Sequence, residues 1–231
     1  MSSVLCNSVF FGVVLSIVSY FIGMFLKKKF KSAVFNPLLI SIILTMLVLI
    51  IFRVDYESYN AGAKYLSYLL TPATVCLAIP LYEQTELLKK NVRAVIAGIT
   101  AGVITSMTCV LLMALLFKLN HEEYVTLLPK SITTAIGMGV SEELGGYVNI
   151  TVAVIIITGV LGNIIAEPVC RLFKITNPVA KGIAIGTAAH AVGTAKAIEM
   201  GEIEGAMSGL SIAVSGLLTV IGAGIFANFI A

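Results

Sequence analysis

The sequence PKSITTAIGMGVSEELGG, residues 129–146, decides how the chain is expected to fold. It carries a lysine, several hydroxyl side chains and glycines, and its apolar part is too short to cross about 30 Å of hydrocarbon. Irregular backbone survives at membrane depth only where protein buries it or where it lines a wet cavity. We therefore predict a re-entrant segment, which enters the membrane and returns to the same side. The alternative is an interfacial loop whose Lys130 side chain extends to the lipid headgroups.

The composition indicates a membrane around this segment. Of the 231 residues, 58% are hydrophobic and 12% are charged, and the mean hydropathy is +1.03. Soluble chains have about 45–50% apolar and about 25% charged residues, so the apolar excess here is expected to contact lipid as well as a protein core. Six uncharged runs are long enough to span the bilayer: 4–26, 32–52, 65–82, 94–117, 144–166 and 205–231. A further run, 182–195, is rich in glycine and alanine and contains His190.

Basic residues beside these runs predict the orientation, because lysine and arginine accumulate on the cytoplasmic side. Four lysines follow the first run within residues 27–31, so the N-terminus is expected outside. If residues 127–146 crossed the bilayer, Arg171, Lys174 and Lys181 would lie on the wrong face, whereas a returning segment places them inside. We therefore predict an all-α, multi-pass protein of the plasma membrane, with about seven spanning helices plus the re-entrant segment.

This topology also predicts an inverted repeat. Spans within residues 32–117 would run in the opposite sense to those within 144–231, and Ala73-Thr74-Val75 weakly resembles Gly193-Thr194-Ala195. Broken helices in inverted halves are typical of secondary transporters with a binding site at the repeat interface. The expected organisation is one membrane domain in three parts. They are an N-terminal anchor helix with a basic loop (1–31), a first repeat (32–126), and the re-entrant segment with a second repeat (127–231).

Three polar clusters lie where hydrocarbon is expected. The first is Thr71-Pro72-Ala73-Thr74, the second covers residues 129–134 with Gly137 and Gly139, and the third covers 182–196, which includes Gly186-Thr187. Ionisable side chains and broken helices at this depth are costly and are by default functional. The candidate substrate-binding residues are Thr71, Thr74, Lys130, Ser131, Thr133, Thr134, His190, Gly193, Thr194 and Lys196.

Each cluster also has a simpler interpretation. Pro72 and Pro80 are compatible with a helix kink alone. His190 is the candidate for proton coupling because histidine titrates near neutral pH, yet a packing residue bonded to a neighbouring carbonyl fits equally well. Lys196 fits an anion site near helix N-termini or an interfacial position beside Glu199.

Signatures of enzymes, metal sites and nucleic-acid binding are missing. The sequence contains no H-E-x-x-H, G-x-S-x-G or P-loop motif, and two histidines cannot form a three-histidine metal site. The four cysteines have no C-x-x-C spacing, and a net charge of +3 spread over short loops is not a nucleic-acid-binding surface. We expect no catalysis, no metal, no cofactor and no nucleic-acid partner.

Five strings resemble the LrgB/CidB family of antiholin-like membrane proteins, and together they extend over most of the chain. They are NPLL (36–39), TPATVCLAIPLY (71–82), LPKSITT (128–134), TGVLG (158–162) and KGIAIGTAAHAVGTAKA (181–197). The sequence departs from the family pattern at Ala135, where proline is usual, and at Thr71, where glycine is usual. The first departure means that the pattern does not determine the backbone conformation at the re-entrant tip, because alanine need not make the break that proline would fix.

The resemblance implies one of two functions. The family is described as controlling murein hydrolase activity and cell lysis, beside a smaller LrgA/CidA-type membrane partner; it also includes plastid glycolate/glycerate carriers and bacterial relatives linked to pyruvate. The intramembrane lysine, histidine and threonines favour a carrier for small monocarboxylates over a holin-like regulator. Such a carrier would work by alternating access in the lipid bilayer, coupled to protons and assembled as a homo-oligomer, with a dimer favoured. The expected carboxylate ligands are the hydroxyls of the clusters and the charge of Lys130, Lys196 or protonated His190.

Overall fold

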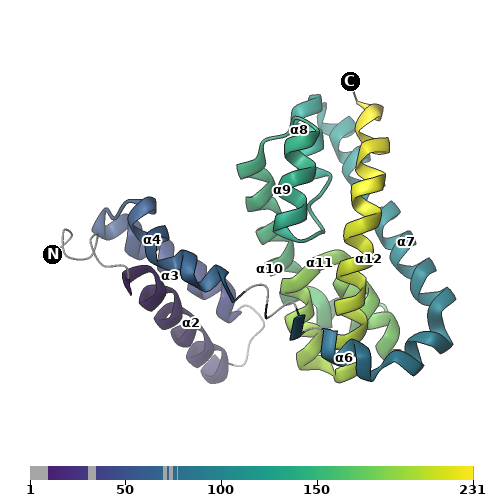
Figure 1. Cartoon of the computed structure of the whole chain (residues 1–231), viewed down its shortest axis with the longest axis horizontal. Coiled ribbons are helices and arrows are strands. Elements are labelled where there is room, and N and C mark those ends of the chain that lie inside the picture. Colours follow the sequence, from purple (N-terminus) through teal and green to yellow (C-terminus); the bar gives the residue numbers. More distant parts are fainter. Residues whose placement is uncertain (1–9, 31–34, 70–71, 73–74, 77, 231) are drawn as a thin grey trace. The chain divides into compact units, whose positions relative to one another are not determined.

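The computed structural model describes residues 10–30, 35–69, 72, 75–76 and 78–230 (Figure 1). Every regular element within these residues is a helix, so the predicted all-α class is confirmed. The chain forms two compact units, Met1–Cys76 and Leu77–Ala231. The first contains α2 (Phe10–Phe30), α3 (Pro37–Phe52) and α4 (Tyr56–Ser67). The second contains α6 (Ala78–Glu83), α7 (Thr85–Phe117), α8 (His121–Leu127), α9 (Thr134–Glu143), α10 (Val148–Leu172), α11 (Pro178–Met200), α12 (Glu202–Phe226) and η1 (Ala227–Phe229).

The three helices of the first unit pack through glycines of α2. Gly12 lies against the backbone of Tyr59 in α4, and a Cβ atom built on Gly23 would lie 2.6 Å from the carbonyl oxygen of Pro37 in α3. These contacts bring the helix backbones close together, as small residues do in membrane helix pairs. No residue of α3, which is described throughout, is buried, so this unit presents a broad apolar surface.

Three long helices, α7, α10 and α12, frame the second unit. α7 and α12 pack closely enough that a Cβ atom built on Gly222 would lie 2.9 Å from the sulfur of Met107. The core around them contains the fully buried side chains of Ile99, Tyr124 and Met207. α10 packs against α9 and α11. This frame holds two helical hairpins.

α8 and α9 form the first hairpin, with a turn at residues 128–133. A Cβ atom built on Gly137 of α9 would lie 3.5 Å from the carbonyl oxygen of Pro129 in the turn. At the open end, the backbone N–H of Tyr147 donates to the Thr126 hydroxyl at 2.7 Å. The chain therefore reverses between α8 and α9 and returns to the end at which it entered.

α11 is a second helical hairpin and not one straight helix. Its backbone leaves the helical region at Ala189 (φ −131°, ψ 16°) and His190 (φ 41°, ψ −142°). In a continuous helix Ile185 and Gly193 would lie about 12 Å apart along the axis. Instead, a Cβ atom built on Gly193 would lie 3.2 Å from the carbonyl oxygen of Ile185. The two arms of α11 therefore run antiparallel, with the tip at Ala189 and His190.

Both arms of α11 pack between α10 and α12. In the first arm, a Cβ atom built on Gly186 would lie 2.8 Å from the Cα atom of Ser208 in α12. In the second arm, the Thr194 hydroxyl lies 2.7 Å from the Ser208 hydroxyl. On the α10 side, the Asn163 side-chain amide donates to the carbonyl oxygen of Val192 at 2.7 Å. Small residues in both arms make this close packing possible.

The two hairpins enter the second unit from opposite ends of α12. The Tyr124 hydroxyl of α8 donates to the carbonyl oxygen of Phe226 at 3.0 Å, close to the C-terminal end of α12. The open end of α11 lies at the other end, where Lys181 forms an ion pair of 3.8 Å with Glu204. Figure 1 shows α8 and α9 at one end of this unit and α11 towards the other. These ends are called the Phe226 end and the Glu204 end, and the hairpin tips lie between them.

Four helices in the described part of the chain are long and apolar enough to cross a membrane: Phe10–Phe30, Leu88–Phe117, Val148–Leu172 and Glu202–Phe229. They coincide with four of the six predicted runs. α3 is a shorter apolar helix. The predicted run at 65–82 is not one helix, because α4 ends at Ser67 and α6 begins at Ala78. The predicted count of about seven spans is therefore not confirmed.

The count of about seven spans includes residues 182–195 as a spanning segment, and the structure corrects this prediction. This stretch does not cross the unit, because it contains the tip of α11 and reverses there. The inverted repeat over 32–126 and 127–231 is not confirmed. Instead, α7 and α10 run in opposite directions inside the second unit, and each is followed by one hairpin.

Candidate functional site

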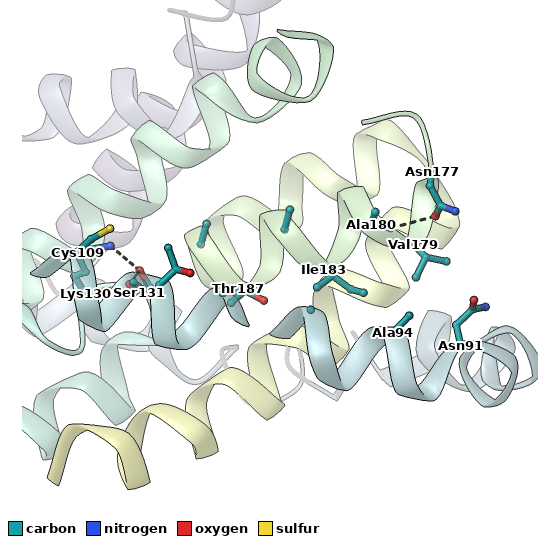
Figure 2. A pocket seen from close by; sticks show the side chains of 16 residues that line it. Asn91, Ala94, Cys109, Lys130, Ser131, Asn177, Val179, Ala180, Ile183 and Thr187 are labelled. Atoms are coloured by element: carbon teal, nitrogen blue, oxygen red, sulfur yellow. Dashed lines mark hydrogen bonds between the residues drawn. The ribbon is translucent and has the colours of Figure 1, made fainter. Parts of the chain in front are cut away.

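A cavity of about 710 Å³ lies between α7, the turn of the α8–α9 hairpin and the first arm of α11. Figure 2 shows Asn91 and Asn177 at one end of it and Lys130, Ser131 and Cys109 at the other. The α7 residues that line it begin at Asn91 and end at Cys109, a length of about 27 Å along the helix. The cavity is thus a long groove that reaches from the start of α11 to the first hairpin tip.

Two glycines of α7 shape the wall that faces α11. A Cβ atom built on Gly98 would lie 3.3 Å from Ile183, and one built on Gly102 would lie 2.7 Å from the Cγ2 atom of Thr187. The first arm of α11 can therefore lie directly on α7 at these two positions. Larger side chains there would push the arm away and change the shape of the groove.

A chain of three polar groups closes the inner end of the cavity. The Lys130 ammonium donates to the Ser131 hydroxyl at 2.9 Å, and that hydroxyl lies 3.1 Å from the hydroxyl of Ser106 in α7. The described part of the chain offers Lys130 no carboxylate oxygen within 4.0 Å. An ammonium without an acidic partner in a cavity can bind an anion, and burying its charge unpaired is costly.

Thr187 supplies a second polar group from the opposite hairpin. Its side chain is buried, with 6% of its surface exposed, and it lines the cavity. Its hydroxyl is the one buried side-chain polar atom without a hydrogen-bond partner in the described residues. A buried hydroxyl left unpaired costs about 1–3 kcal/mol, so this position favours a ligand that can bond to it.

Of the predicted site residues that the structure describes, only Lys130 and Ser131 line this cavity. Thr133 and Thr134 begin α9, where Thr133 is the N-cap residue but makes no side-chain capping hydrogen bond. Neither threonine lines the cavity. Thr71 and Thr74 lie outside the described residues.

The predicted residues at the tip of α11 hold the hairpin together. The His190 ring is buried against α10, and its Nε2 atom lies 3.0 Å from the carbonyl oxygen of Ile155. The Thr194 hydroxyl contacts the carbonyl oxygen of His190 at 3.0 Å and the Ser208 hydroxyl. Gly193 lies against the first arm. None of the three lines the cavity, and the geometry fits the simpler interpretation of His190 as a packing residue bonded to a carbonyl.

Lys196 lies outside the cavity that Lys130 and Ser131 line. It forms ion pairs with Glu167 at 3.3 Å and with Glu199 at 3.4 Å, and Glu167 also pairs with Arg171 at 2.6 Å. These residues line a second cavity at the Glu204 end, between the end of α10 and both arms of α11. The Lys196 charge is therefore already neutralised by carboxylates, which fits the predicted alternative of a position beside Glu199.

Sequence reasoning missed Thr187, Ser106 and Cys109 as cavity residues. Thr187 belongs to a noted polar cluster, and Ser106 lies beside Thr105 inside an otherwise apolar run. Both signals are visible in the sequence. They become interpretable only when the first arm of α11 packs on α7, where Thr187 contacts Gly102, one helical turn from Ser106.

Comparison with known proteins identifies related chains over nearly the full length. A family model described as the LrgB-like family matches residues 16–229. The chain is 38% identical over 224 residues to the antiholin-like protein LrgB of Bacillus subtilis (strain 168), covering 96% of this chain and 97% of the relative. It is 37% identical over 222 residues to the antiholin-like protein LrgB of Bacillus mycoides (strain KBAB4), covering 96% of each. No solved structure matches the chain.

Proposed function

The chain belongs to the LrgB-like family and is a multi-pass membrane protein; within this family we propose that it carries small monocarboxylates, of the size of pyruvate, glycolate and glycerate, by alternating access. The observation that carries the proposal is the position of Lys130. It is a cation without an acidic partner among the described residues, at one hairpin tip, in a cavity that the first arm of a second hairpin also lines.

Lys130 and Ser131 together form the proposed carboxylate-binding group. The ammonium binds one carboxylate oxygen as a charge-assisted hydrogen bond, which is stronger than a bond between neutral groups. Ser131 is positioned by Ser106, whose hydroxyl lies 3.1 Å away. When the Ser106 hydroxyl is the donor in this contact, the Ser131 hydroxyl proton is free to donate to the second carboxylate oxygen. The group thus matches the charge of one small carboxylate.

The opposite entry of the two hairpins supports alternating access. The groove reaches Lys130 along the first arm of α11, from the side of Asn91 and Asn177. Access from the Phe226 end would require the turn of the α8–α9 hairpin to move away from α7, which breaks the contact between Ser106 and Ser131. One hairpin on each side of the site therefore offers two separate gates. In this proposal both hairpins are re-entrant segments, because their irregular turns are buried in protein at the middle of the unit.

Several further features belong to the same proposal. The carrier lies in the plasma membrane with its N-terminus outside, and it assembles with a second copy as a dimer. Proton coupling runs through His190, whose ring bonds to the carbonyl oxygen of Ile155. Protonation would add a hydrogen-bond donor to the His190 ring, which is part of the α11 tip and contacts α10. This would shift the balance between the positions of the α11 hairpin.

A second function, an antiholin-like regulator of murein hydrolases and cell lysis, is favoured by the names of the relatives. Such a regulator would act through a smaller membrane partner of the LrgA/CidA type. It needs no ligand-binding cavity, and it gives no reason for the unpaired Lys130. The two functions are therefore distinguished by ligand binding.

Ligand-dependent thermal stability of the purified full-length protein tests this distinction. A ligand that binds only the folded state stabilises it by about 2.7 kcal/mol at 100 times its Kd. We expect pyruvate, glycolate or glycerate to raise the Tm of the wild-type protein, and Lys130→Gln to abolish the shift. The matched control is Lys89→Gln, which removes an exposed lysine of α7 outside the cavity. A folded wild-type protein without any shift would favour the regulator.

A further inference from the structure

Among the buried helical hydroxyls of the described residues, that of Thr187 is unusual. Helical serine and threonine side chains can bond to the carbonyl oxygen four residues earlier. Ser16, Thr126, Thr194 and Ser211 make such a bond, at 2.7, 2.6, 3.0 and 2.8 Å respectively. Thr187 makes neither this bond nor any other within the described residues, although it is buried, with 6% of its surface exposed. Its hydroxyl thus has no hydrogen-bond partner within the described residues, and its side chain lines the cavity.

Thr187 lies close to the proposed carboxylate-binding group. It contacts α7 at Gly102, and Ser131 contacts α7 at Ser106. These two α7 positions are one helical turn apart, about 6 Å along the axis. A ligand of a few heavy atoms can therefore reach both hairpins at once.

We propose that Thr187 determines specificity by bonding to a second oxygen of the ligand, a hydroxyl or keto group on the carbon next to the carboxylate. This inference rests on the proposed function, in which Lys130 and Ser131 bind the carboxylate. One ligand then bridges the two hairpins. Carboxylates without the second oxygen leave the Thr187 hydroxyl unpaired, and sites built to bond a polar group discriminate strongly against analogues that lack it.

The thiol of Cys109 can be used to detect ligand binding in the cavity. Cys109 lines the cavity beside Lys130 and is exposed. In a full-length variant with Cys6, Cys76 and Cys170 replaced by alanine, a small hydrophilic thiol reagent labels Cys109 alone. A bound carboxylate blocks the reagent, so the concentration that halves the labelling rate measures affinity without any transport step.

Two matched pairs of ligands separate the second oxygen from the carboxylate: lactate with propionate, and glycolate with acetate. In the variant with Thr187 intact, we expect lactate to protect Cys109 at a concentration at least tenfold lower than propionate, and glycolate likewise relative to acetate. Thr187→Val keeps the shape of the side chain, including the methyl group against Gly102. It should remove the difference in protective concentration within each pair, because only the protection by lactate and glycolate becomes weaker. Thr187→Ser, which retains the hydroxyl, should restore at least half of the preference on a logarithmic scale.

Three other outcomes would overturn the inference, and they can be told apart. If Thr187→Val weakens both members of each pair equally, Thr187 acts only through the shape of the cavity. If the preference persists in Thr187→Val, another group binds the second oxygen. If no carboxylate protects Cys109 in a variant that retains the wild-type Tm, the carboxylate-binding group itself is absent, and the proposed function fails with the inference.

Discussion

Gly102 of α7 lies against Thr187 of α11, so that a Cβ atom built on Gly102 would lie 2.7 Å from the Cγ2 atom and 3.4 Å from the Cβ atom of Thr187. The methyl group of a buried, β-branched side chain cannot easily rotate away from such a contact. The first arm of α11 can therefore keep its place on α7 only while position 102 carries no side chain.

We predict that Gly102→Ala lowers the Tm of the protein and weakens carboxylate binding. Overpacking a well-packed contact costs about 1–3 kcal/mol, and here it displaces the arm that carries Thr187. The matched control is Gly224→Ala in α12, because no atom lies within 4 Å of a Cβ built there. That change should be neutral or stabilising, since alanine favours helix by about 1 kcal/mol over glycine. Equal Tm shifts in the two variants would show that the contact of Gly102 with Thr187 is not tight.

Thr194 and Ser208 should hold the second arm of α11 on α12. Their hydroxyls lie 2.7 Å apart, and both side chains are fully buried. Thr194→Val leaves the Ser208 hydroxyl without this partner, so we expect a loss of about 1–3 kcal/mol in the free energy of unfolding. Thr194→Ser should lose less, because it keeps a hydroxyl. A double-mutant cycle with Ser208→Ala measures the coupling, and a coupling of zero would contradict this assignment.

Lys196 should contribute little to substrate binding, in contrast to Lys130. It is paired with Glu167 and Glu199, outside the cavity that contains Lys130. Because such partly exposed ion pairs contribute about 0–1 kcal/mol, Lys196→Gln should change stability only slightly. It should also leave the concentration of carboxylate that half-protects Cys109 unchanged. A loss of protection as large as in Lys130→Gln would show that Lys196 belongs to the binding site.

His190 should be tested for proton coupling by His190→Gln. The glutamine side chain can still donate to the carbonyl oxygen of Ile155, which the His190 Nε2 atom contacts at 3.0 Å, so the hairpin tip should remain folded. Because glutamine does not titrate, uptake by the variant should lose its dependence on pH across the range in which histidine titrates. The measurement is initial uptake into proteoliposomes at several pH values. A pH dependence equal to that of the wild-type protein would exclude His190 as the coupling group.

The sequence indicates that residues 129–146 are irregular, but it does not predict the reversal of residues 182–195. The lysine, hydroxyls and glycines of residues 129–146 indicate a segment that cannot be a spanning helix, and the structure has a chain reversal there. Residues 182–195 show the same local composition but also fit a weak spanning helix. What makes that stretch a hairpin is contact with α10 and α12, for example of Gly186 with Ser208. Such contacts join residues far apart in the chain, and no local pattern encodes them.

The candidate site illustrates the same limit. Rarity of charge at membrane depth was enough to single out Lys130, because an isolated lysine in an apolar chain stands out. The same criterion also selected His190 and Lys196, which the structure places outside the cavity. Thr187 and Ser106 carry no charge, and threonine and serine are common in membrane helices. Only their position on the two sides of one cavity distinguishes them from packing residues.

Counterflow uptake of labelled pyruvate, glycolate and glycerate by the purified protein in proteoliposomes tests the central claim most directly. The account predicts saturable uptake by the wild-type protein and by Lys89→Gln, and its loss in Lys130→Gln while that variant keeps a wild-type Tm. Absence of uptake by folded wild-type protein, with and without a smaller LrgA/CidA-type partner, would contradict the account and assign the chain to the regulation of lysis.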